Sequence, residues 1–201
     1  MLRIRLAALA TASVLILGPL TACSSGPSPE AGTAVTSGAV DAASEGAGLL
    51  EAQGLAGKTG REIVEALDQL DAPRPLPVAA SVRYDEVVVT DGVTEEVLPI
   101  EDQFYLSLAP YETSTHECYF HNLGTCRGEL ADTDVHVTIT TGDGEVLVDE
   151  DATTYANGFV GFWVPRDVTG TIQVTKDGKT AESAFSSDPE GATCVTTLQL
   201  V

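Results

Sequence analysis

Short apolar runs that alternate with polar residues, each followed by a tight-turn signal, fill most of the sequence after residue 80. Residues 134–141 alternate strictly, so Val135, Val137 and Ile139 share one face, as is typical of a strand with one buried side. Asp-Gly or Gly-Asp-Gly steps lie at 91–92, 142–144 and 177–178, and such steps favour hairpin turns. We predict a mainly β chain, α+β overall, with an antiparallel β-sandwich-like C-terminal domain, a small barrel being the alternative.

The remaining strands are predicted from runs of the same kind. They cover residues 82–90, 104–108, 146–149, 158–164, 171–175, 180–185 and 194–201. The run 158–164 is apolar throughout, which suits a central buried strand. We expect the aromatic side chains of Phe159, Phe162 and Trp163 in the core, and we assign Tyr119 and Phe120 there as well.

A helical pattern precedes the strands, over residues 47–72. Thr59 and Glu62 fit a capping box, in which each residue satisfies a free backbone amide of the other. Pro73 ends the pattern. The predicted apolar face of this helix consists of Ile63, Ala66, Leu67 and Leu70.

The first residues have the composition of an export signal. Arg3 and Arg5 precede an apolar run, and Leu20-Thr21-Ala22-Cys23 resembles a bacterial lipobox, in which Cys23 becomes the lipidated first residue of the mature protein. The residues after Cys23 are rich in Ser, Gly, Ala and Pro, which predicts a disordered linker. The protein is therefore expected in the cell envelope, lipid-anchored to the extracytoplasmic face of the membrane.

The chain is acidic, with a formal net charge of −20. Such a charge repels phosphate backbones and argues against nucleic-acid binding. Scattered acidic residues most often form a solvated surface, so acidity alone does not predict a metal site.

Sulfur and imidazole groups gather in residues 116–126. This stretch holds Cys118, Cys126, His116 and His121, and the remaining cysteine outside the signal region is Cys194. Thiolate and imidazole are ligands that Cu(I) and Zn(II) prefer. Three thiolates suit Cu(I), and His116 or His121 would complete a tetrahedral Zn(II) site, so copper is the expected metal and zinc ranks below it.

A Cys118–Cys126 disulfide is the alternative interpretation of the same stretch. Closing a loop of that size contributes about 2.5 kcal/mol in the chain-entropy model, and export favours oxidation. The disulfide leaves Cys194 unexplained, because three cysteines cannot all pair within one chain. A dithiol that reduces Cu(II) would join the two interpretations, since it yields Cu(I) and a disulfide that a reductant must reset. His136 lies on the polar face of its strand and is expected at the surface.

Four segments of the sequence resemble the CueP family of envelope copper-binding proteins: residues 106–111, 116–130, 157–166 and 193–200. The second reads His-x-Cys-Tyr-Phe-His-x-Leu-x-Thr-Cys-x-Gly-Glu-Leu, and the last reads Thr-Cys-Val-Thr-Thr-Leu-Gln-Leu. The resemblance implies copper binding through three cysteines, which fall on Cys118, Cys126 and Cys194. It also implies a role in copper resistance, storage or delivery, reduction of Cu(II), and a two-domain, dimeric arrangement.

These observations combine into one prediction of domain organisation. Residues 1–22 form the lipoprotein signal peptide, 23–46 the lipidated cysteine and disordered linker, 47–77 a small helical region, and 78–201 a β-rich metal-binding domain. The protein is expected to sequester copper as Cu(I), and Cu(II) is the alternative oxidation state of the bound ion. Its expected partners are the copper ion, the membrane, an envelope cuproprotein acceptor or thiol reductant, and a second copy in a homodimer. The alternatives are a cupric reductase or thiol–disulfide oxidoreductase that uses Cys118 and Cys126, although the usual Cys-x-x-Cys spacing is absent, and a β-domain that its cysteines merely cross-link.

Overall fold

The computed structural model describes residues 43–201. The predicted signal peptide, the lipidation site Cys23 and nearly all of the predicted linker lie outside the described residues. Within the described part, no helix combines the length and the apolar character needed to cross a membrane.

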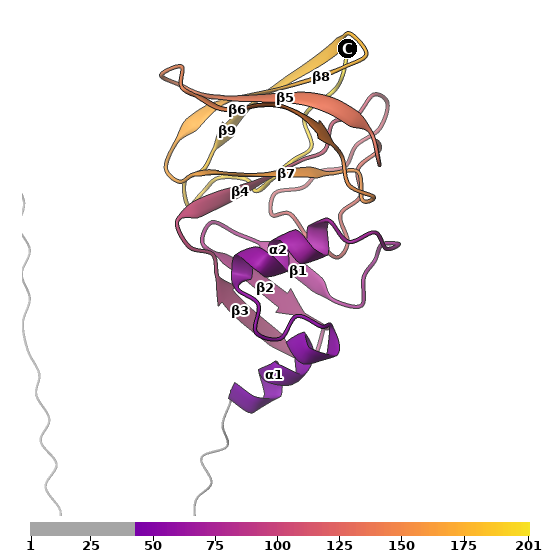
Figure 1. Ribbon diagram of the computed structural model, residues 1–201, viewed down its shortest axis with the longest axis vertical. Coiled ribbons are helices and arrows are strands. Elements are labelled where there is room, and N and C mark those ends of the chain that lie inside the picture. The colour runs from indigo at the N-terminus through magenta and orange to yellow at the C-terminus, as the bar shows by residue number, and fades with distance from the viewer. Residues whose placement is uncertain (1–42) are drawn as a thin grey trace, which may run out of the picture. The chain divides into compact units, whose positions relative to one another are not determined.

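A β-sandwich forms the C-terminal part of the fold (Figure 1). One sheet has the strand order β6-β5-β8-β9, with all neighbours antiparallel. Its strands are β5 (Asp134–Thr141), β6 (Val146–Thr153), β8 (Thr169–Lys176) and β9 (Lys179–Ser186). The facing sheet has the order β10-β4-β7. Its strands are β4 (Gln103–Leu108), β7 (Val160–Pro165) and β10 (Cys194–Val195).

The sandwich core contains the side chains that the alternating pattern assigned to it. Val137 and Ile139 of β5 are fully buried in the same core as Phe104 of β4. Val135 belongs to the same core. The mainly β, antiparallel fold predicted from the sequence is therefore confirmed, because burial of one face of each strand requires a second sheet to cover it.

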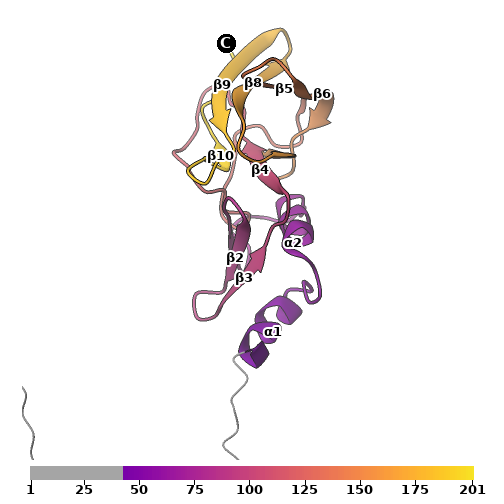
Figure 2. The same ribbon diagram turned by 90° about the vertical axis from the view of Figure 1, so that its left-hand side faces the viewer.

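A second core lies between two helices and a three-stranded sheet (Figure 2). The helices are α1 (Ala43–Ala52) and α2 (Gly60–Asp68), and the sheet, in the order β1-β2-β3, consists of β1 (Ala79–Val82), β2 (Glu86–Thr90) and β3 (Glu95–Pro99). The predicted capping box begins α2: the backbone amide of Thr59 donates to Glu62 at 2.8 Å, and that of Glu62 donates to the Thr59 hydroxyl at 3.3 Å. Ile63 and Leu67 are buried as predicted.

Three local predictions need correction. Leu70 is 42% exposed, because α2 ends at Asp68 and the chain leaves the helix axis before Leu70 can continue the apolar face. The run 82–90 is not one strand: it bends between β1 and β2, which pair antiparallel with Val82 opposite Val87. The closing run 194–201 contributes only two residues to a strand, β10.

The stretch 116–126 connects the β1-β2-β3 sheet to the β10-β4-β7 sheet of the sandwich. On one side, the amide of Val82 at the end of β1 donates to the carbonyl of His121 at 2.8 Å. On the other side, the amide of Cys194 at the start of β10 donates to the carbonyl of Tyr119 at 3.1 Å. The cysteine-rich loop is therefore held in place by backbone hydrogen bonds to both parts of the fold.

Candidate metal centre

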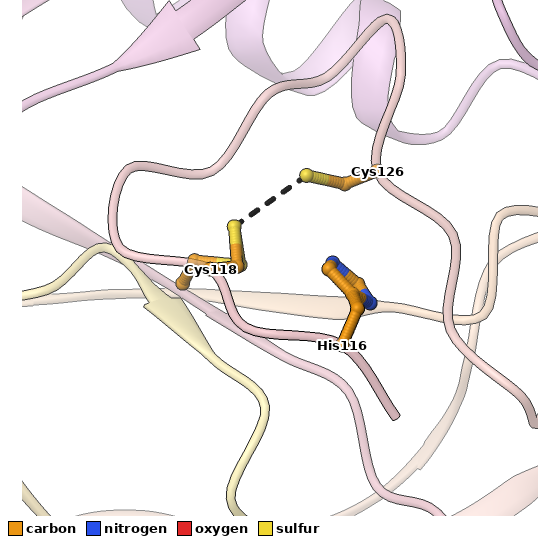
Figure 3. A group of neighbouring side chains, drawn as sticks. His116, Cys118 and Cys126 are labelled. Carbon is orange, nitrogen blue, oxygen red and sulfur yellow. Dashed lines mark hydrogen bonds between the residues drawn. A yellow bond between two sulfur atoms is a disulfide. The ribbon is translucent and has the colours of Figure 1, made fainter. Parts of the chain in front are cut away.

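The three cysteines meet at one point of this loop. Cys118 and Cys194 form a disulfide, with their Cα atoms 5.7 Å apart, and Cys126 carries the free thiol among the described cysteines. The sulfur of Cys126 lies 3.6 Å from that of Cys118 (Figure 3). The Cys118–Cys126 disulfide considered from the sequence is therefore wrong: the partner of Cys118 is Cys194, because β10 brings the latter under the loop.

His116 completes a group of four candidate ligands. The ligand atoms of His116, Cys118, Cys126 and Cys194 all lie within 4.8 Å of one another. The Nε2 atom of His116 is buried and has no hydrogen-bond partner among the described residues. A buried polar atom without a partner costs free energy. A ligand position beside three sulfurs accounts for that cost, because a bound ion would satisfy the nitrogen.

A tight turn returns the chain from Cys118 to Cys126. The amides of Thr125 and Cys126 both donate to the carbonyl of Asn122, at 3.2 and 2.9 Å, and the Gly124 amide donates to the Asn122 side chain at 3.1 Å. A side chain at Gly124 would overlap the carbonyl oxygen of Val78. The turn thus requires glycine at this position because the loop packs closely against the backbone that leads into β1.

His121 lies behind the sulfurs rather than among the four grouped ligands. It is fully buried. Its Nε2 lies 2.9 Å from Oδ1 of Asp68, and its Nδ1 lies 3.8 Å from the sulfur of Cys194. Burial by itself lowers the pKa of His121, but the charge and hydrogen bond of Asp68 outweigh that effect and raise the pKa to about 9.

Asp68 is a residue of this site that sequence reasoning missed. The side chain is fully buried and accepts hydrogen bonds from Tyr105 Oη and Asn157 Nδ2, each at 2.7 Å, in addition to the contact with His121. Burial raises the pKa of Asp68, yet the His121 charge and these hydrogen bonds hold it below the ordinary value. A signal was present in the sequence: Asp68 follows Val64 by four residues, which places a carboxylate on the buried face of α2.

The thiol of Cys126 is poised to ionise. Burial raises its pKa, but the hydrogen bond and the charge of His121 outweigh burial, so the net effect is a pKa below that of an ordinary thiol. The amide of Asn122 also donates to the Cys126 sulfur at 3.4 Å. Thiolate is the form that binds metals and the form that attacks disulfides.

Two aromatic residues of the loop do not lie where the sequence placed them. Tyr119 is 51% exposed and Phe120 is 40% exposed, so the prediction of core positions for both is wrong. Instead, the two rings pack edge to face against one another with their centroids 5.0 Å apart, and the Tyr119 hydroxyl donates to the carbonyl of Glu190. Phe159 does lie in the core, with its ring centroid 4.4 Å from that of His121. The predicted surface position of His136 is confirmed: it lies between the carboxylates of Asp149 and Asp151 with its side chain 43% exposed.

Comparison with known proteins decides the family. The family model of the periplasmic copper-binding protein CueP matches residues 62–199. The chain belongs to the CueP family. Among solved structures, the crystal structure of S.CueP is similar at 42% sequence identity and a TM-score of 0.76, over 78% of this chain and 97% of that one. A search of curated proteins finds no match. Copper binding outside the cytoplasm, as the name of the CueP family states, is thus supported together with the mainly β fold.

Proposed function

We propose that this CueP-family protein sequesters copper as Cu(I) on the thiolates of Cys118, Cys126 and Cys194, and so contributes to copper resistance in the cell envelope. The observation that carries the proposal is the convergence of three sulfurs and one imidazole nitrogen within 4.8 Å. A soft, sulfur-rich donor set favours Cu(I) over hard cations. The only methionine of the chain is Met1, so thioether ligands do not compete with the thiolates.

His116 is the proposed additional ligand of this site. Its Nε2 is buried without a hydrogen-bond partner, and one of its ring nitrogens lies within 4.8 Å of the three sulfurs. His121, by contrast, has its Nε2 engaged by Asp68. The sequence left open which histidine binds the ion. We propose that His116 binds it and that His121 lies behind the sulfurs.

Copper loading requires reduction first. The Cys118–Cys194 disulfide must accept two electrons and two protons from an external dithiol, which is itself oxidised to a disulfide. The three thiols then lose their protons as they bind the ion, because the thiolate is the metal ligand. Reduced protein should therefore bind copper and oxidised protein should not.

A lipid on Cys23 would hold this site at the membrane surface, where a sequestering protein acts on copper as it crosses. The residues 23–46 would serve as the tether. Metabolic labelling with a fatty acid tests the anchor: the wild-type chain should carry the label and Cys23→Ser should not. The homodimer and the envelope acceptor stay predictions, which sedimentation and copper transfer measurements address.

Competitive Cu(I) titration of the reduced protein tests the proposed site. The lipid-free Cys23→Ser chain is titrated anaerobically against a chromophoric Cu(I) chelator, alone and with Cys194→Ser or His116→Gln added. We expect tight one-to-one binding that Cys194→Ser abolishes and His116→Gln weakens. His136→Gln is the matched control, because His136 lies on the exposed face of β5, and it should bind as the parent does. Unchanged affinity in Cys194→Ser would contradict a three-thiolate site.

Cupric reduction is the second candidate function, and the disulfide between two of the proposed ligands favours it. Two thiols can each give one electron to Cu(II), which forms two Cu(I) and one disulfide and releases two protons. The electron-donating pair would be Cys118 and Cys194, in place of the Cys118 and Cys126 pair considered from the sequence. Reduced protein mixed with Cu(II) should then yield two Cu(I) per Cys118–Cys194 disulfide; copper that stays Cu(II) excludes this function.

A further inference from the structure

The structure assigns to Asp68 the role of positioning residue for the copper site: its carboxylate holds His121 by Nε2, so that Nδ1 faces the sulfurs and hydrogen-bonds the Cys194 thiolate in the copper-bound state. This inference rests on the proposed function, because it concerns how the same site stabilises its ion. Asp68 touches none of the candidate ligands and acts through His121.

Asp68 is not placed where it would stabilise the helix that carries it. It is the last residue of α2, and a negative charge at a helix C-terminus is unfavourable to the helix dipole. Its side chain is fully buried, where an ion pair is a weak source of stability because desolvation offsets the attraction. The carboxylate is therefore better explained by what it orients than by what it adds to folding.

The hydrogen bonds of Asp68 leave His121 a single orientation. Oδ1 accepts from His121 at 2.9 Å and from Asn157 at 2.7 Å, while Oδ2 accepts from Tyr105 at 2.7 Å. The ring of Phe159 packs on the imidazole, with the centroids 4.4 Å apart. With one nitrogen held and one face covered, the imidazole directs Nδ1 to the Cys194 sulfur, 3.8 Å away.

The buried position of Cys194 explains why such a donor is needed. Three thiolates around one Cu(I) leave a net negative charge on the site, and Cys194 is the sulfur ligand that solvent reaches least, at 3% exposure. Water cannot stabilise the charge on this sulfur, so a fixed protein donor must do so. Residues that hydrogen-bond the ligands of a metal site stabilise the site in this way, and their mutation typically weakens metal binding about 10- to 100-fold.

A double-mutant cycle separates positioning from structural support. Cu(I) affinity of the reduced, lipid-free full chain is measured for the parent, Asp68→Asn, His121→Gln and the double variant. Asparagine keeps the shape but replaces the charged acceptor of His121 by a weaker, neutral one. Glutamine retains a donor for Asp68 and lacks the group that faces the sulfur. We expect each single variant to weaken Cu(I) binding about 10- to 100-fold, and the double variant to bind no more weakly than His121→Gln.

Ser187→Ala is the control, because it removes a buried hydroxyl that donates to the carbonyl of Pro165 at 2.8 Å and bonds neither Asp68 nor His121. It should lower the midpoint of urea unfolding without the loss of Cu(I) affinity. Additive losses in the cycle, or an Asp68→Asn protein that binds Cu(I) like the parent, would overturn the positioning role while leaving the copper site itself established. If no variant binds because the parent does not, the proposed function has failed instead.

One measurement needs no variant. In the ¹⁵N-labelled, reduced, copper-free protein, the ring NMR signals of His121 should show a hydrogen-bonded proton on Nε2, and Cu(I) addition should shift Nδ1 more than Nε2. An Nε2 without a proton, or an Nδ1 signal indifferent to Cu(I), would contradict the inference even if Asp68→Asn fails to fold.

Discussion

Cys118 and Cys194 are 76 residues apart in the sequence, and they are joined where a loop crosses over the first residue of a strand. Cys194 pairs in parallel register with Ser107 of β4, and its amide donates to the carbonyl of Tyr119 at 3.1 Å. These backbone bonds do not depend on the disulfide. We therefore expect the two sulfurs to stay close when the disulfide is reduced, as a shared copper ligand set requires.

Reduction of this disulfide should lower the stability of the protein. A closed loop of this length constrains the unfolded chain, so the oxidised protein should be more stable by about 2–4 kcal/mol. Urea unfolding of both redox states in metal-free buffer measures the difference. Cys126→Ser should preserve it, since Cys126 lies outside the disulfide. If the oxidised and reduced states of Cys126→Ser had the same free energy of unfolding, the protein would use another cysteine pair in solution.

The oxidised protein should present Cys126 as its reactive cysteine. Cys126 is half-buried, carries a thiol whose pKa lies below the ordinary value because of His121, and is the free cysteine among the described residues. Alkylation of the native oxidised chain followed by peptide mapping should place the label on Cys126. A label on Cys194 would instead reveal a Cys118–Cys126 disulfide, formed when the Cys126 sulfur, 3.6 Å from Cys118, displaces Cys194.

Acid should loosen the chain that leads into the metal centre. The carboxylate of Glu129 accepts from the Thr113 hydroxyl and from the amides of Thr113 and Glu112, and these bonds lower its pKa to about 2. Because the folded-state pKa is depressed, the stabilisation is complete above the ordinary value of 4.5 and is lost as the pH falls towards about 2. Urea unfolding across this range should show the loss in the parent and a weaker pH dependence in Glu129→Gln.

Glu182→Gln is the control for this experiment, because Glu182 is an exposed glutamate on β9, away from the loop. Its pH dependence should match that of the parent. Equal pH dependence in the parent and in Glu129→Gln would mean that the hydrogen bonds of Glu129 do not contribute to stability.

Gly161→Ala should disturb both the sandwich and the metal centre. A Cβ at Gly161 would overlap the hydroxyl of Tyr105, which is buried and donates to Asp68. Overpacking of this kind costs about 1–3 kcal/mol. Calorimetry should show a lowered melting temperature, and Gly142→Ala should show little change, because its Cβ meets its nearest neighbour at 3.6 Å. A Gly161→Ala protein as stable as the parent would show that Tyr105 can move without loss.

Local patterns in the sequence predicted much of the fold because the forces behind them act over a few residues. The strand at residues 134–141 was predicted with both ends correct, since strict alternation continues to its last residue. The Thr59–Glu62 capping box and the Asp91-Gly92 hairpin depend on hydrogen bonds within three residues. Leu70 was misassigned because its burial depends on where the helix ends and what packs against it, which the helical period does not contain.

The candidate site, too, could be predicted only in part. By itself, the sequence determined its composition, since the chain has only four cysteines and three histidines, and two of each fall in one stretch. The tertiary structure decided which of them pair. Cys118 joins Cys194 rather than Cys126, and His121 meets Asp68, 53 residues earlier, because strand pairing and the packing of two cores bring distant segments together. Such contacts depend on the free energy of the whole fold, whereas the turns and strand patterns that led to them depend on neighbours in the chain.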